Sequence, residues 1–228
     1  MYCIISLAGV VTRRNLTMQK FKFDVKTMVL LGLLTAIVAV FSFTPIGSIP
    51  VGPLVITLNI IPIAIAAITL GPVGGAIIGG VFGIFSFLQC FGIGVPSGMG
   101  AILVDINLPF AFIQRFVPRL LDGFLAGLIF QLVAKVSDVR ISCFITGLCT
   151  AFFNTVFFMF SLVFLFGKTE YVQGLMKGKS VIPFIISLVG INAVVEMAVC
   201  TVITGAVGTA LYLAKFIKSP KKKSQPKT

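Results

Sequence analysis

Long apolar stretches cover most of this chain and predict helices that cross a membrane. A helix needs about 20 mainly apolar residues to span the hydrocarbon core of a bilayer. Charged residues make up only 11% of the sequence, and no segment outside the apolar stretches is long enough to fold as a soluble domain. We therefore predict an all-α membrane protein, a six-transmembrane-helix bundle. The expected spans are 27–44, 54–71, 73–91, 116–136, 141–167 and 182–216.

Proline and glycine mark the breaks between these spans. The segment 43–53, FTPIGSIPVGP, is predicted to be a stiff folded connection rather than a strand or a helix. At Leu70-Gly71-Pro72 two spans meet with almost no loop, which predicts a tight helical hairpin. The segment 92–115 is apolar but interrupted by glycine and proline, so we expect a loop or re-entrant piece packed against protein.

Small residues recur at helical spacing in two of the spans. Gly75, Gly79 and Gly83 lie at i, i+4 and i+8, a stripe that lets another helix backbone approach closely. Gly32 and Ala36 form a second small pair in the first span. That pair either packs two helices of this chain or docks a helix of another subunit.

The net charge of +12 is distributed as in a membrane protein and does not indicate nucleic-acid binding. Most Lys and Arg residues lie at the ends and turns predicted to be cytoplasmic, so both termini are expected in the cytoplasm. We divide the chain into an N-terminal extension (1–19), a membrane domain (20–216) and a basic cytoplasmic tail (217–228) near anionic lipid. The predicted outer side keeps Arg115, Arg119, Lys168, Lys177 and Lys179.

Polar side chains inside the spans are the candidates for function, because polar groups are costly in hydrocarbon. Asn154 lies in the fifth span, and Asn192 and Glu196 lie one helical turn apart in the sixth. These groups could converge to supply amide donors and acceptors and one carboxylate to a ligand. The alternative is that they only hydrogen-bond the two helices together.

Arg115 and Arg119 flank Pro118 at the predicted start of the fourth span. An arginine there can bind a ligand carboxylate through two parallel hydrogen bonds. The alternatives are an interface anchor or a salt bridge to Asp105, Asp122 or Glu196. The chain has no histidine and five scattered cysteines, which argues against metal sites and general-base chemistry. We predict that it is not an enzyme and holds no cofactor of its own.

Five segments in this order resemble the substrate-binding S components of energy-coupling-factor (ECF) vitamin transporters. The resemblance covers roughly residues 20–216 and implies a bundle that captures a vitamin from outside. The resemblance also implies that the bundle then docks, through the small face at Gly32 and Ala36, on a membrane coupling subunit driven by two ATPases. Gly32 replaces the family's usual alanine, and Asp122 stands where an apolar residue is expected. The segments are GLLTA, SIPVGPLVITLNIIPIAIAAITLGPVGGAIIG, FVPRLLDGFLAGLIF, FNT and INAVVE.

The GSIPVGP, FNT and INAVVE segments are most similar to pantothenate-type S components. Pantothenate has one carboxylate, an amide and two hydroxyls, which would suit a pocket of arginine and asparagine side chains. Riboflavin or a pyrimidine precursor is the alternative ligand, although the chain has no Trp and three Tyr for stacking a flat ring. A stand-alone channel and a membrane enzyme remain the other classes. The resemblance also implies a multi-pass protein of a bacterial cell membrane.

Overall fold

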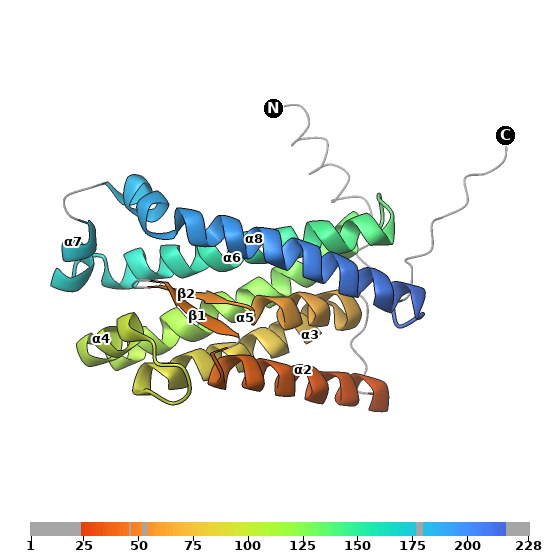
Figure 1. The fold of residues 1–228 in the computed structure, drawn as a ribbon, viewed down its shortest axis with the longest axis horizontal. Coiled ribbons are helices and arrows are strands. Elements are labelled where there is room, and N and C mark those ends of the chain that lie inside the picture. Colours follow the sequence, from red (N-terminus) through yellow and green to blue (C-terminus); the bar gives the residue numbers. More distant parts are fainter. Residues whose placement is uncertain (1–23, 46, 52–53, 177–179, 218–228) are drawn as a thin grey trace.

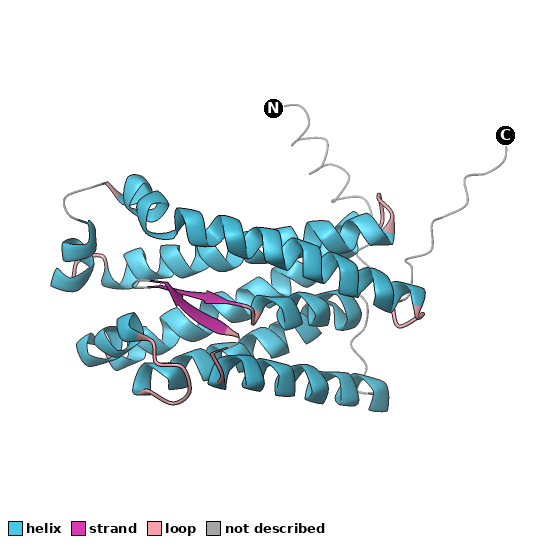
Figure 2. Ribbon diagram, in the orientation of Figure 1, coloured by secondary structure: helices cyan, strands magenta, loops and turns pink. Residues whose placement is uncertain are grey.

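The computed structural model describes residues 24–45, 47–51, 54–176 and 180–217, so the predicted N-terminal extension and nearly all of the basic tail lie outside the described residues. The described chain forms one bundle of long helices that run alongside one another (Figure 1). A β-hairpin and several short helices accompany them (Figure 2). The helices are α2 (Val25–Phe43), α3 (Ile60–Leu88), α4 (Gly98–Ile106), α5 (Leu108–Val133), α6 (Val139–Phe166), α7 (Glu170–Met176) and α8 (Val181–Leu213), with the 3-10 helix η1 (Gln89–Phe91) after α3.

Five stretches of the described chain are long and apolar enough to cross a membrane. Large apolar side chains point outward along them, for example Phe160 at 65% and Phe164 at 76% exposure, as expected for surfaces that face lipid. The prediction of a mainly helical multi-pass membrane protein is therefore confirmed in its general form, while the count of six spans stays a prediction. The stretches are Val25–Phe43, Ile60–Phe91, Leu108–Val133, Val139–Phe166 and Ala193–Leu213.

The predicted span 54–71 is wrong in its first part. Residues 48–57 form an antiparallel hairpin of β1 (Ser48–Val51) and β2 (Leu54–Thr57), in which Ser48 pairs with Thr57. The prediction that 43–53 contains no strand is therefore also wrong. A short apolar run such as LVIT is equally compatible with strand and helix, and the pairing with SIPV decides between them.

Helix α3 reverses direction at Gly71, as predicted. Gly71 has φ 77° and ψ −167°, a backbone conformation open mainly to glycine. In a straight helix, residues 67 and 75 would lie about 12 Å apart along the axis, yet a Cβ added at Gly75 would lie 3.1 Å from the Ala67 Cβ. The two arms of α3 are therefore antiparallel. The arm before Gly71 is only about 16 Å long, too short to cross a bilayer alone.

The glycine stripe of α3 packs against α5, as the spacing predicted. A Cβ at Gly75 would collide with the carbonyl of Gly123, and a Cβ at Gly79 would collide with the carbonyl of Arg119. Because neither position carries a side chain, the backbones of α3 and α5 touch directly. This close contact fixes the height and rotation of α5 relative to α3.

The segment 92–115, predicted to be irregular, is mostly helical. Its middle forms α4, and α5 begins at Leu108, where the Asn107 side chain accepts a hydrogen bond from the Phe110 N–H at 3.1 Å. Such a cap satisfies an amide at the start of the helix. The helix of the predicted fourth span therefore starts eight residues before the expected residue 116, which places Arg115 two turns inside α5.

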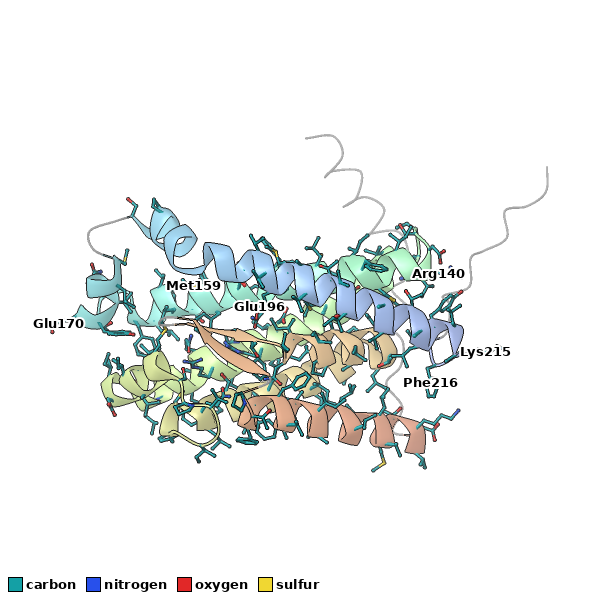
Figure 3. All side chains as sticks on the ribbon, in the orientation of Figure 1. Arg140, Met159, Glu170, Glu196, Lys215 and Phe216 are labelled. Carbon is teal, nitrogen blue, oxygen red and sulfur yellow. The ribbon has the colours of Figure 1, made fainter. Side chains whose placement is uncertain are left out.

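Helix α2 begins and α8 ends at the same end of the bundle (Figure 1). Arg140 and Lys215 lie at that end and Glu170 lies at the opposite end (Figure 3). This arrangement agrees with termini on one side of the membrane, while the side itself stays a prediction.

Candidate functional site

Helix α5 carries three charged side chains into the interior of the bundle. Arg115 is 7% exposed, Arg119 is 5% exposed and Asp122 is fully buried. Their spacing of four and three residues places them on one face of the helix. Charges are costly to bury unless they are paired, so this face is the strongest candidate for a functional site. We call Arg115 and Arg119 the arginine pair.

Neither arginine of the pair forms an ion pair with a carboxylate of the described residues. The alternative prediction of a salt bridge to Asp105, Asp122 or Glu196 is therefore not realised in that part of the chain. Arg119 does lie close enough to Asp122 and Glu196 to interact with their charges over a longer distance. Both oxygens of Asp122 are buried without a hydrogen-bond partner, and the structure does not explain this residue.

Aromatic rings contact the arginine pair where carboxylates do not. The centroid of the Phe158 ring lies 4.8 Å from Cζ of Arg119 and 5.4 Å from Cζ of Arg115. The Phe82 ring lies 5.4 Å from Cζ of Arg119. Such contacts stabilise a cation by about 0.5–1 kcal/mol at exposed sites and by about 2 kcal/mol where water is excluded. The rings therefore compensate part of the cost of burying two charges.

The hydrogen-bond donors of the pair are only partly used. Arg115 donates from Nη2 to Ser97 Oγ at 3.0 Å. Its Nε, and both Nε and Nη1 of Arg119, are buried without a partner. The arginine pair therefore offers charged N–H groups in a protected environment, where an added acceptor would gain the most.

Asn154 of α6 is also buried, with 6% exposure and no partner for its Oδ1. It lies four residues before Phe158, so the two side chains share one face of α6. The structure therefore brings the predicted Asn154 to the same face of α6 as the ring that contacts the arginine pair.

Glu196 of α8 is 9% exposed and lies midway along the bundle (Figure 3). Its Oε1 accepts a hydrogen bond from the Thr57 N–H at 3.2 Å, so it ties the end of β2 to α8. The side chain of Asn192, the other predicted residue of this helix, lies outside the described residues.

A hollow of about 430 Å³ lies at the start of α4, and neither arginine of the pair lines it. Its wall includes Ser97, whose hydroxyl accepts the hydrogen bond from Arg115. One hydrogen bond therefore separates the hollow from the guanidinium of Arg115. The hollow is lined by Gln89, Cys90, Phe91, Gly92, Pro96, Ser97, Gly98, Ala101, Val104 and Asp105.

Three contributors to the site were not predicted: Phe158, Phe82 and Ser97. The position of Phe158 one turn after Asn154 is the signal that could have identified it. With 23 phenylalanines in the chain, however, ring identity alone selects no position. Ser97 can be recognised as a contributor only once α4 is known to begin directly after it.

The predicted coupling residues Gly32 and Ala36 lie on the exposed face of α2. A Cβ added at Gly32 would meet nothing within 4 Å. Neighbouring side chains on this face are also exposed, including Val29 at 66% and Leu33 at 56%. The buried side chains Leu34 and Val38, on the opposite face, pack against α3. The small pair is therefore not used for packing within the described chain.

Comparison with known proteins places this fold in a family. The model of the family "ECF transporter, substrate-specific component" matches residues 26–208. The pantothenate transporter PanT of Leuconostoc mesenteroides subsp. mesenteroides is 27% identical over 187 residues, which cover 78% of this chain and 85% of the relative. The pantothenic acid transporter PanT of Lactococcus lactis subsp. cremoris is 26% identical over 173 residues, covering 73% and 81%. The match confirms the resemblance noted in the sequence, and the chain belongs to the family of substrate-specific components of ECF transporters.

Proposed function

We propose that this chain captures pantothenate from outside a bacterial cell and delivers it to an ECF coupling subunit driven by two ATPases. Family membership supports a role in transport. The names of both relatives support pantothenate as the ligand. The observation that carries the proposal is the arginine pair, which is buried, cationic and without a carboxylate partner in the described chain.

The chemistry of pantothenate matches the groups around the pair. Its carboxylate would accept paired hydrogen bonds from one edge of the Arg119 guanidinium, whose Nε and Nη1 are buried without a partner. Paired bonds of this kind are short and strong, and they fix the orientation of the carboxylate. The amide and hydroxyl groups would bind Asn154 and Asn192. Glu196 would close the site by holding β2 in place, since its Oε1 already accepts a hydrogen bond from the Thr57 N–H at the end of β2.

The coupling interface is proposed at Gly32 and Ala36 of α2. The support is geometric, because both residues are exposed and a Cβ at Gly32 would meet nothing. A small-residue face allows the backbone of a partner helix to approach closely in a membrane. ATP would be hydrolysed by the partner subunits. Both termini would lie in the cytoplasm, following the positive-inside bias.

Isothermal titration of the detergent-purified chain, without partner subunits, tests the proposal. We expect tight one-to-one binding of pantothenate. Tight binding of riboflavin or a pyrimidine precursor instead would keep the transport role and refute the ligand. If the protein is shown to be folded by its thermal unfolding transition and still binds no vitamin, capture by this chain alone would be refuted. A channel or an enzyme would then be favoured.

A further inference from the structure

The arginine pair presents a physical problem of its own. Two like charges one turn apart on a helix repel each other, and no described carboxylate lies between them as a counter-ion. Arg115 is held by the hydroxyl of Ser97 at 3.0 Å. Arg119 makes no hydrogen bond from Nε or Nη1. Something else must hold the two guanidinium groups at a defined spacing if they are to bind one ligand.

Phe158 is the one aromatic ring of the described residues that lies over both guanidinium groups. Its ring centroid lies 4.8 Å from Cζ of Arg119 and 5.4 Å from Cζ of Arg115, whereas the Phe82 ring reaches Arg119 alone. The negative face of an aromatic ring attracts cations. Such a contact engages the charge of a guanidinium and leaves its N–H donors free for a carboxylate.

We propose that Phe158 is a positioning residue of the substrate site. Its ring holds the arginine pair at the spacing that receives the ligand's carboxylate, and it thereby sets the preference for an anionic ligand over a neutral one. This inference rests on the proposed function, since it assumes that the ligand's carboxylate binds the pair. The matching role for Phe82 is smaller, because that ring contacts one guanidinium only.

Phe158 also packs beside the cluster of Met99, Leu103 and Leu162, so the experiment must separate positioning from packing. Phe158→Leu keeps an apolar side chain and removes the ring, while Phe158→Tyr keeps the ring. Phe157→Leu is the matched control, because Phe157 is the next residue of α6 and stacks on Phe153 at 5.5 Å instead. Each purified variant is titrated with pantothenate and with pantothenol, in which a primary alcohol replaces the carboxylate.

The expected result is a selective loss. Phe158→Leu weakens pantothenate binding about 30-fold, the equivalent of one desolvated cation–ring contact, and leaves pantothenol binding unchanged. Phe158→Tyr and Phe157→Leu bind both ligands as the wild type does. In the Arg119→Gln background the effect of Phe158→Leu shrinks, because interacting residues are not additive.

Two results would overturn the inference. An equal loss of affinity for both ligands in Phe158→Leu would assign the residue to packing, and unchanged pantothenate affinity would remove it from the site. If pantothenol binds too weakly to titrate, additive effects of Phe158→Leu and Arg119→Gln would count against positioning in the same way. Failure of the wild type to bind pantothenate would instead refute the proposed function, and this inference with it.

Discussion

Replacing Arg119 by glutamine should weaken pantothenate binding more than any other single change in the site. Arg119 is 5% exposed, and its buried Nε and Nη1 have no partner, so the guanidinium has donors free for a carboxylate. A hydrogen bond to a charged group contributes about 1.5–3 kcal/mol. Losing two such bonds, with partial replacement by the amide, should cost about 3 kcal/mol, or roughly 150-fold in Kd.

The structure also ranks the two arginines. Arg115 already donates from Nη2 to Ser97 Oγ, so fewer of its donors are available to the ligand. Arg115→Gln should therefore cost about 1.5 kcal/mol, or roughly 10-fold in Kd. This ranking separates a site built around Arg119 from a general attraction of anions to positive charge.

Isothermal titration with pantothenate measures both changes, and Arg140→Gln is the control. Arg140 is exposed at the end of the bundle, so its loss should leave the Kd unchanged. Thermal unfolding of each variant verifies that the fold persists. Equal losses for Arg140→Gln and Arg119→Gln would refute the reasoning, as would an Arg119→Gln variant that binds like the wild type.

Three further outcomes are expected. Gly32→Leu should abolish vitamin uptake in cells that contain the ECF partners and leave binding by the purified chain intact; loss of binding would contradict the coupling role. Gly79→Ala should lower the free energy of unfolding by about 1–3 kcal/mol, since its Cβ would strike the Arg119 carbonyl. Gly32→Ala should not lower the free energy of unfolding, and comparative thermal unfolding can check both outcomes. Asn154→Ala should weaken pantothenate binding by about 1–3 kcal/mol through loss of one buried hydrogen bond, and an unchanged titration would return Asn154 to a packing role.

The sequence predicted those parts of the fold that local physics determines. The apolar stretches marked the helices because length and hydrophobicity alone decide whether a helix can cross a bilayer. The reversal at Gly71 followed from one glycine-proline pair, and the close approach of α3 to α5 followed from glycines at helical spacing. Each of these signals is contained within about three turns of one segment.

The errors fell where the pairing of two segments or a single cap residue decides the outcome. Residues 54–57 form a strand because they pair with 48–51, a choice that their own composition leaves open. The start of α5 depends on a single cap at Asn107, and because the helix starts eight residues earlier than predicted, Arg115 lies in the interior and not at the interface. The buried arginines and Asn154 were predictable from the cost of burying polar groups, whereas the ring of Phe158 was not, since aromatic residues are common throughout this chain.

The packing of α3 on α5 also determines the geometry of the site. Gly79 lies against the backbone carbonyl of Arg119, so one of the close backbone contacts between the two helices occurs at the residue that offers the free donors. A shift of α5 at this contact would move Arg119 relative to the Phe158 ring on α6. Packing changes at Gly79 should therefore reduce stability and ligand affinity together. Changes on the exposed face of α2, which lies apart from this contact, should alter neither property of the purified chain.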